Sequence, residues 1–276
     1  MKFTSDKLLG RKKRIWELDF LRGLAICLMC FDHFMYDLAI LPSFFTNFDE
    51  VMTPGMWEWW NIGYEFNTSL FREICHYIFA GLFLFISGIS CTLSKNNFER
   101  SLRLFIFAGI LTCVTALIDS FASMGALIVF GIIHCLAVSV LIYALIDKFL
   151  KNDCWTLIFG AVLIIAGIAI PWYEMEFVPF ALGDDFMTFL RAALGFVRIG
   201  SDHFPLLPCC GLLLVGSYVG KKFYGGKRSL LPRLDGSWNG TFVFIGRRTV
   251  WVYMLHQPVI AGIIVFFGLL NGLEVF

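Results

Sequence analysis

Seven long runs of apolar residues, separated by more polar segments, make up most of this chain. A helix needs about 20 predominantly apolar residues to cross the hydrocarbon core of a bilayer, at 1.5 Å rise per residue. The pattern therefore predicts membrane-spanning helices over residues 18–41, 74–94, 102–118, 125–146, 154–171, 206–219 and 249–270. We expect an all-α membrane protein, a bundle of about seven transmembrane helices.

The segments between these runs give weaker predictions. Residues 42–70 are polar and aromatic and contain Trp57, Trp59 and Trp60, so we expect a loop that rests at the membrane interface. Within the mixed stretch 172–205, residues 186–196 could form an interfacial helix. No internal repeat and no linker divides the chain, which predicts one domain over residues 18–270 behind a basic tail, residues 1–17.

The first apolar run differs from the others because it carries a stripe of ionisable residues. Steps of three and four along a helix place them on one face, with Asp32 at the edge of the stripe. The stripe consists of Asp19, Arg22, Ile26, Met29, His33 and Asp37. Ionisable groups in hydrocarbon cost from about 2.5 to more than 10 kcal/mol each, so they usually face a bundle interior or a wet cavity. The stripe indicates that this helix forms the wall of a functional site.

The composition is typical of a membrane protein, and the positions of the cysteines limit the kinds of site that are expected. The chain is 58% hydrophobic and 16% charged, whereas soluble domains are nearer a quarter charged. Of nine cysteines, only Cys75 lies near the end of a run, and even the C-x-x-C pair Cys27 and Cys30 lies within one. We interpret the cysteines as packing residues and expect no metal site. We expect no nucleic-acid partner. The first run is expected to be retained and not cleaved as a signal peptide.

The distribution of Lys and Arg predicts the orientation in the membrane. The side of the N-terminus carries six in the tail, three in residues 94–103, two in 147–153 and seven in 221–248, eighteen in all. The opposite side carries three: Arg72, Arg191 and Arg198. Because cytoplasmic loops carry the excess of Lys and Arg, the N-terminus is predicted to be cytoplasmic, in a multi-pass protein of the cell (inner) membrane.

All five histidines lie in or beside the predicted spans: His33, His76, His134, His203 and His256. His33 follows Asp19 by 14 residues, roughly 21 Å at helical rise, which places it toward the outer side. Arg22 and Asp19 mark the cytoplasmic edge of the same helix. A single membrane histidine is more often a structural partner to a carbonyl or hydroxyl group, but five of them together with Asp32, Asp37, Asp202 and Arg22 favour a site.

Several of these residues lie in segments that resemble a known family. The run RIWELDFLRGLAICLMCFDHFMYDL is similar to the opening signature of the heparan-α-glucosaminide N-acetyltransferase catalytic-domain family, and further segments follow in the same order. These segments are FLFISGIS (83–90), FGIIHCLAVS (130–139), SDHFPLLPCCG (201–211) and GRRTVWVYMLHQPV (246–259). The family consists of membrane-embedded acyltransferases, and the chain resembles its compact bacterial branch.

This resemblance implies acyl transfer, most simply of an acetyl group, from cytoplasmic acetyl-CoA to a sugar or similar acceptor on the far side. Arg22 would then meet the phosphates, because its planar fork pairs with their oxygens. His33, oriented by Asp37, would act as general base or take the acyl group itself. Asp32 completes the expected catalytic group; Asp19, His134 and His256 are assigned to the cofactor with Arg22, and His76 and Asp202 to the acceptor.

Several alternatives stay open at this point. The family's lysosomal enzyme has its proposed active histidine in the loop after the first span, but residues 42–70 contain none, so His33 is chosen from its position and His76 is the reserve. Asp202 could instead cap a helix before Pro205, and Asp19 and Arg22 could simply pair with each other. A transporter of a polar metabolite or a non-catalytic seven-span protein also fits a charged stripe. The sequence does not decide the oligomeric state, and a homo-oligomer is left open.

Overall fold

The structure is a computed structural model, and it describes residues 14–122, 125–150, 152–170, 175–179 and 185–275. Among these residues the regular elements are all helices, apart from one isolated bridge between Phe177 and Arg198. The α-helices are α1 (Trp16–Ala39), α2 (Phe48–Val51), α3 (Pro54–Thr68), α4 (Leu70–Leu93), α5 (Asn97–Ala122), α6 (Ile132–Phe149), α7 (Cys154–Ile168), α8 (Phe186–Leu194), α9 (Leu206–Tyr224), α10 (Gly240–Gly246) and α11 (Thr249–Leu270). Short 3₁₀ turns cover Leu41–Phe44, Pro232–Leu234 and Ser237–Asn239.

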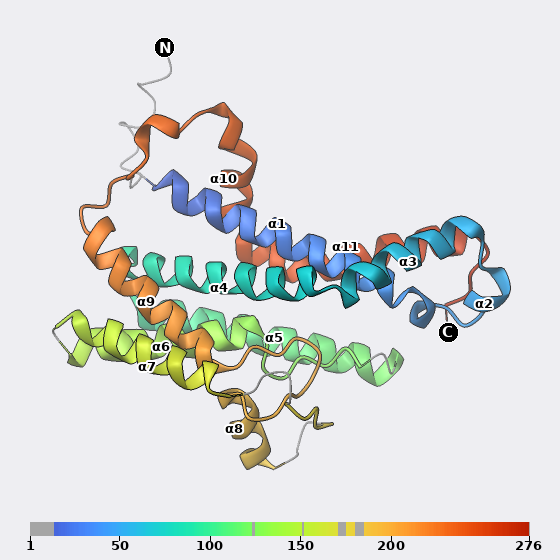
Figure 1. Cartoon of the computed structure of the whole chain (residues 1–276), viewed down its shortest axis with the longest axis horizontal. Helices are drawn as coiled ribbons and strands as arrows, with labels where there is room; N and C mark the ends of the chain where they lie inside the picture. Colours follow the sequence, from blue (N-terminus) through green and yellow to red (C-terminus); the bar gives the residue numbers. More distant parts are fainter. Residues whose placement is uncertain (1–13, 123–124, 151, 171–174, 180–184, 276) are drawn as a thin grey trace.

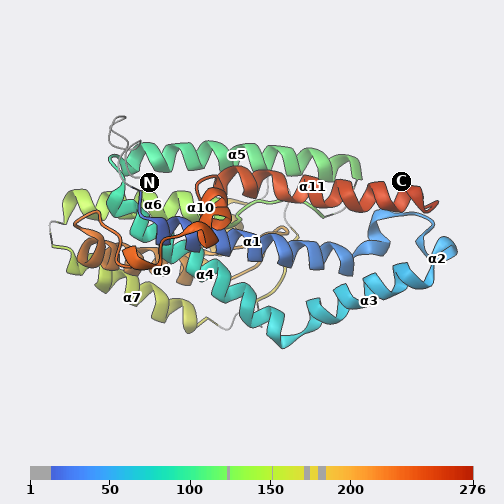
Figure 2. The ribbon, with the colours of Figure 1, turned by 90° about the horizontal axis from the view of Figure 1, so that it is seen from above.

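The long helices run side by side along the length of the molecule (Figures 1 and 2). In the described part of the chain, five of them, α4, α5, α6, α9 and α11, are long and apolar enough to cross a membrane, and α7 is a shorter apolar helix. Helix α1 is as long as α4, 24 residues, but it carries the charged stripe. The chain is therefore a multi-pass membrane helical bundle, as the hydropathy pattern predicts.

Helix α4 lies at the centre of the packing. It contacts α1 on one side and α9 on the other, and α9 in turn packs against α6 and α7 (Figure 1). Helix α1 also contacts α3, α10 and α11. The buried core between α4, α6 and α9 contains Leu84, Val140 and Leu213, each with no exposed surface. This arrangement places one face of α1 against α4 and another against α11.

Small residues permit the closest helix contacts, as expected without a hydrophobic driving force between helices in lipid. A Cβ atom on Gly88 of α4 would overlap the carbonyl oxygen of Leu213 on α9. At the start of α1, a Cβ atom on Gly23 would overlap the carbonyl oxygen of Phe242, and one on Gly246 would overlap that of Asp19. The α1–α10 contact therefore depends on a glycine from each side.

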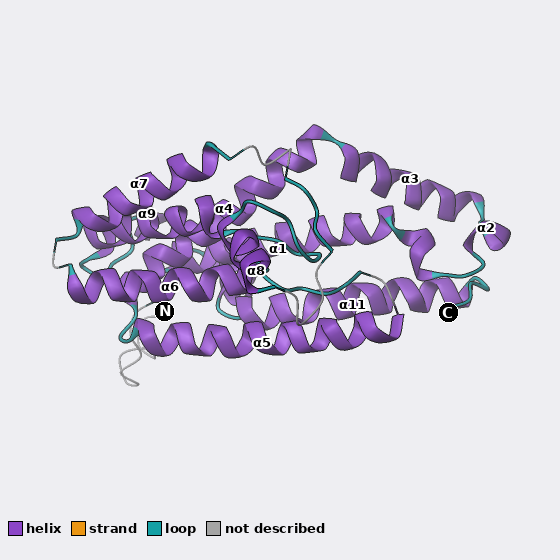
Figure 3. Ribbon diagram, turned by 90° about the horizontal axis from the view of Figure 1, so that it is seen from below, coloured by secondary structure: helices purple, strands orange, loops and turns teal. Residues whose placement is uncertain are grey.

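Two sequence expectations are corrected by the structure. Residues 42–70 are not a loop, because α2 and all of α3 lie there. Thr53 caps α3 by accepting a hydrogen bond from the backbone N–H of Met56 at 3.3 Å. The predicted span 125–146 begins too early, since α6 starts at Ile132 and extends to Phe149. The expected helix within 186–196 is present as α8, which lies below the bundle in Figure 1 and is seen end-on in front of it in Figure 3.

Candidate functional site

The site is built around Asp32 on α1 and the first two turns of α4. Ser69 begins α4 by accepting a hydrogen bond from the backbone N–H of Arg72 at 3.1 Å, a normal N-cap contact. Arg72 and His76 are four residues apart and therefore lie on one face of that helix. This face meets Asp32, whose residue is 6% exposed.

Asp32 accepts three hydrogen bonds from these two side chains. Arg72 donates from Nε to Oδ1 at 2.7 Å and from Nη2 to Oδ2 at 3.0 Å, and His76 Nδ1 lies 3.1 Å from Oδ2. The two-pronged arginine contact supplies the charge that a buried carboxylate needs. Because the carboxylate accepts, Nδ1 of His76 carries the hydrogen, which leaves Nε2 of His76 as a proton acceptor.

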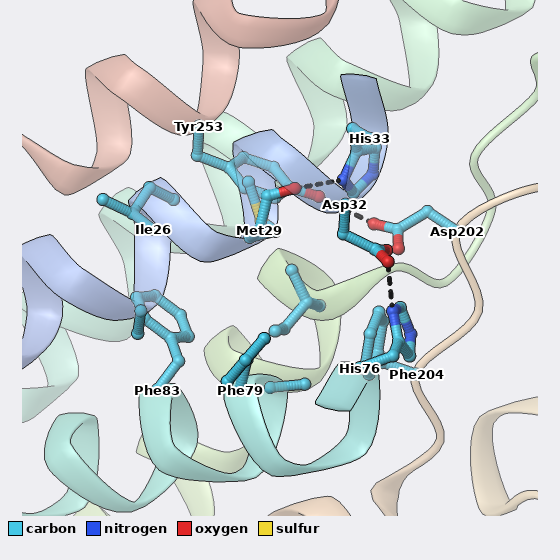
Figure 4. Close-up of a pocket in the computed structure, with 13 residues that line it drawn as sticks. Ile26, Met29, Asp32, His33, His76, Phe79, Phe83, Asp202, Phe204 and Tyr253 are labelled. Carbon is cyan, nitrogen blue, oxygen red and sulfur yellow. Dashed lines mark hydrogen bonds and ion pairs between the residues drawn. The ribbon is translucent and has the colours of Figure 1, made fainter. Parts of the chain in front are cut away.

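These residues line a small pocket, here called the His76 pocket (Figure 4). Its walls include Ile26 and Met29 from α1, and Phe79 and Phe83 from α4, so most of its surface is apolar. The ring of His76 stacks on Phe204, with centroids 5.5 Å apart and an interplanar angle of 26°. The cavity volume is about 30 Å³, room for a group about the size of a water molecule. Its polar lining residues are Asp32, His33, His76, Asp202 and Tyr253.

His33 lines the same pocket but has different partners from those expected. Its Nδ1 bonds to the carbonyl oxygen of Met29 at 3.0 Å, one turn earlier on α1. Its ring meets the ring of His256 edge to face, with centroids 4.8 Å apart. His256 Nδ1 in turn donates to the carbonyl oxygen of Tyr253 at 2.6 Å, and within the described residues Nε2 of His256 is buried without a hydrogen-bond partner.

Asp37, expected to orient His33, has a different hydrogen-bond partner in this structure. Both carboxylate oxygens of Asp37 accept from Nε2 of Gln257, at 2.8 and 2.9 Å. Asp37 has no exposed surface. His33 bonds back toward the preceding turn, whereas Asp37 points across to α11, so being four residues apart does not bring them into contact.

Asp202 contributes to the pocket and does not cap a helix. Its Oδ2 accepts the hydroxyl hydrogen of Tyr253 at 2.7 Å, while α9 begins after Pro205 with no side-chain cap. The neighbouring His203 has both ring nitrogens buried without a hydrogen-bond partner among the described residues. Burial, together with the positive charge of Arg198, lowers the pKa of His203 to about 4.

The cofactor group expected from the sequence is divided between separate places. Arg22 and Asp19 are together, with Arg22 Nη1 2.7 Å from Asp19 Oδ1, as the simple pairing alternative also predicts. His256 instead packs on His33. His134, at the start of α6, is occupied structurally: Nδ1 accepts from the backbone N–H of Gly131 at 3.3 Å, and Nε2 donates to Thr112 Oγ1 at 3.0 Å.

Three arginines surround the single carboxylate of Asp19. Besides Arg22, Arg247 Nε lies 3.3 Å and Arg14 Nη1 lies 3.9 Å from Asp19 Oδ2. Arg22 also donates from Nη2 to Ser90 Oγ on α4 at 3.2 Å, and its Nε is buried without a partner in the described residues. Three positive charges around one negative charge leave a surplus that suits a phosphate-bearing ligand. We call this group the arginine cluster.

Sequence reasoning missed Arg72, Tyr253, Gln257 and Arg247. Arg72 could have been found from its spacing: it lies four positions before His76 at the start of an apolar run. Residues four apart share a helix face. The other three lie on or beside α11 and gave no periodic signal of their own. Among the described residues, no group of three His, Cys, Asp or Glu side chains is arranged to hold a metal ion, and all nine cysteines are free.

Comparisons with known proteins agree with the resemblance seen in the sequence. The model of the family described as "Heparan-alpha-glucosaminide N-acetyltransferase, catalytic" matches residues 14–258. No curated protein and no solved structure matches the chain. The matched region runs from the start of the arginine cluster to the middle of α11 and contains every residue of the His76 pocket. The chain therefore belongs to the heparan-α-glucosaminide N-acetyltransferase catalytic-domain family.

Proposed function

We propose that this protein is an acyltransferase of the cell membrane that moves an acetyl group from cytoplasmic acetyl-CoA to a carbohydrate or similar acceptor on the other side. The family suggests a membrane acetyltransferase with acetyl-CoA as donor. The observation that carries the proposal for this chain is the buried set Arg72–Asp32–His76 beside a small pocket. A histidine whose Nδ1 is held by a carboxylate is the arrangement that general-base catalysis uses.

In the proposed topology α1, α4, α5, α6, α7, α9 and α11 form seven spans, with the N-terminus in the cytoplasm. The count of eighteen Lys and Arg against three supports this orientation. The contact between Asp19 near the N-terminus and Arg247 after α10 fits it, because both then lie on the cytoplasmic side. Cysteines introduced at Lys227 and Asn47 test it: an impermeant reagent added to intact cells should label only the second.

The arginine cluster fits the phosphates of the donor. Arg22 and His33 are 11 residues apart on α1, roughly 16 Å at helical rise, and Ile26 and Met29 lie between them along the stripe. Arg14 and Arg247 are the more exposed members, with side chains 60% and 46% exposed, and so present free N–H groups to a ligand arriving from the cytoplasm. The His76 pocket, at about 30 Å³, is too small for a long acyl chain, so acetyl is the acyl group that requires the least opening of it.

In the chemical step, the hydroxyl or amine of the acceptor attacks the thioester carbonyl carbon. Nε2 of His76 accepts the proton that the acceptor loses, and Asp32 stabilises the imidazolium that forms. When the carbon–sulfur bond breaks, the same proton passes to the departing thiolate. In the alternative route Nε2 of His76 is the nucleophile: it attacks the thioester carbonyl carbon and CoA leaves as its thiolate. The acceptor then attacks the acyl-histidine, and its proton passes to the Nε2 that is released. His33, whose Nδ1 is held by Met29, is the second candidate for the base because its Nε2 is also left as an acceptor.

Release of free thiol from acetyl-CoA by the purified protein tests the proposal. A transporter or a non-catalytic membrane protein would release none, with or without acceptor. We expect His76→Ala to reduce turnover by about 10² to 10⁴, the usual share of a general base, with CoA affinity unchanged. His33→Ala should reduce it less. Normal turnover in His76→Ala with loss in His33→Ala would assign the base to α1 instead.

A further inference from the structure

A second pocket lies at the opposite end of the contact between α4 and α6. Its volume is about 280 Å³, against about 30 Å³ for the His76 pocket. It forms where α4 ends, α5 begins, α6 ends and α9 ends, and three lysines line it: Lys95, Lys148 and Lys221. We call it the lysine pocket. It lies on the side of the bundle that carries the excess of Lys and Arg.

The packed core separates the two pockets. Leu84 on α4, Val140 on α6 and Leu213 on α9 lie between them and have no exposed surface. Close packing of this kind leaves no passage for a chain of atoms. The lysine pocket therefore has no passage through the α4–α6 contact to His76.

The charges around the lysine pocket favour an anion. Lys221 is already paired, with Asp147 at 2.5 Å and Asp153 at 2.6 Å. In the described part of the chain, neither Lys95 nor Lys148 has a carboxylate within ion-pair distance, and both are exposed. Lys221 offsets one of the two aspartate charges, and Asp147 itself lines the pocket, so Lys95 and Lys148 leave a net positive charge for a ligand.

Arg100 adds a third cation beneath the same pocket. Its Nη1 lies 3.6 Å from Sγ of Cys91, one of the lining residues, and its guanidinium has no carboxylate partner among the described residues. The pocket lies between helices, and its polar lining includes Asn97. Asn97 Nδ2 donates one hydrogen to the carbonyl oxygen of Cys91 at 3.0 Å and has a second hydrogen for a phosphate oxygen.

The rim of the pocket is aromatic and exposed. The ammonium of Lys148 lies 5.7 Å from the ring centroid of Phe98 and 5.5 Å from that of Phe149. These two rings are 39% and 69% exposed. A polar, cationic hollow beside exposed rings at the end of membrane helices matches a ligand with an anionic head and apolar chains. Basic pockets between transmembrane helices on the cytoplasmic side bind anionic lipid headgroups in this way.

We propose that the lysine pocket binds the phosphate of an anionic phospholipid, with the acyl chains passing along Phe98 and Phe149. The site is independent of the acyltransferase reaction proposed above, because the packed core separates it from His76. It places a lipid where α4, α5, α6 and α9 meet, so the bound lipid stabilises the folded bundle.

The test is titration of the purified full chain in detergent with phosphatidylglycerol, followed by the rise in unfolding temperature. The pocket variant is Lys95→Gln with Lys148→Gln; its matched control is Lys222→Gln with Lys227→Gln, two lysines of the same end that lie outside the pocket. We expect the pocket variant to lose about 30-fold in affinity and the control less than about threefold. Lys95→Arg with Lys148→Arg should keep the wild-type affinity, which separates loss of charge from loss of fold.

Three results would overturn the proposal. One is equal phosphatidylglycerol affinity in the pocket variant and its control. Another is equal affinity of the wild type for phosphatidylcholine, which carries no net charge. The third is displacement of phosphatidylglycerol by CoA or by inorganic phosphate, at concentrations that leave the fold of the control variant unchanged. That result would assign the pocket to a soluble phosphate compound.

Discussion

Arg72 provides a sharp test of the catalytic proposal, because it contacts Asp32 and only through Asp32 affects His76. Replacing it with lysine keeps the positive charge but removes the planar fork. The two contacts at 2.7 and 3.0 Å become one contact from a flexible ammonium group. Asp32 then stays paired but is free to rotate away from Nδ1 of His76.

The size of the effect follows from the hydrogen bond that is lost. A hydrogen bond to a charged group contributes about 1.5–3 kcal/mol. If this energy normally holds Asp32 in the orientation that serves His76, its loss corresponds to about a 10- to 150-fold fall in turnover. Arg72→Gln removes the charge as well, and leaving a buried carboxylate unpaired costs about 3–5 kcal/mol of stability. The lysine variant is therefore the informative one.

The assay is steady-state thiol release from acetyl-CoA, with kcat and KM measured separately and CoA affinity measured by calorimetry. Arg191→Lys is the matched control, since Arg191 is exposed near the end of α8. We expect Arg72→Lys to lower kcat while KM for acetyl-CoA and the unfolding temperature stay near wild type. A purely structural role would lower the unfolding temperature and leave kcat of the folded fraction intact. Wild-type kcat in a normally folded Arg72→Lys protein would refute the assignment of Asp32 and His76.

Three further outcomes are expected. Arg22→Lys should weaken CoA binding about 10-fold or more by calorimetry, because one ammonium cannot reproduce the fork; unchanged affinity would mean that Arg22 only bridges Asp19 and Ser90. Gly246→Ala should destabilise the protein by about 1–3 kcal/mol in thermal unfolding, because its Cβ overlaps the Asp19 carbonyl oxygen, whereas Gly109→Ala, with open space around it, should not. The unfolded state binds a proton at His203 below pH 6.5 and the folded state only below about 4, so stability should fall as the pH drops through this window, and less so in His203→Asn.

The hydropathy pattern predicts most of the fold because spanning helices need long apolar runs. Its clearest failure is the start of α6. Residues 125–131 are apolar enough to continue a helix, but in the structure they form none and bond to the segment before α9. The N–H of Ser201 donates to the carbonyl oxygen of Leu127 at 3.0 Å and that of Phe204 to the carbonyl oxygen of Phe130 at 3.1 Å. Hydropathy carries no information on which group accepts a backbone hydrogen bond. An apolar segment that bonds to a distant segment therefore has the same hydropathy as one that continues a helix.

The site was predicted in part, for a related reason. Periodicity identified the ionisable face of α1 but carries no information on how neighbouring helices are rotated about it. Hydropathy places Arg72 outside the predicted span, because the apolar run that follows it begins at Ile74. The cap at Ser69 starts α4 earlier and brings Arg72 into the first turn, onto the same face as His76.

The rotation of α1 explains why its ionisable residues have partners on different helices, although Asp32 and His33 both line the His76 pocket. Successive residues of an α-helix are about 100° apart, so Asp32 and His33 point in different directions although they are adjacent. Because α1 packs against both α4 and α11, Asp32 meets Arg72 and His76 on the first side. His33 and Asp37 meet His256 and Gln257 on the second. Asp32, at the edge of the predicted stripe, thus holds the proposed base His76. Asp37, within the stripe, joins α1 to α11 through Gln257.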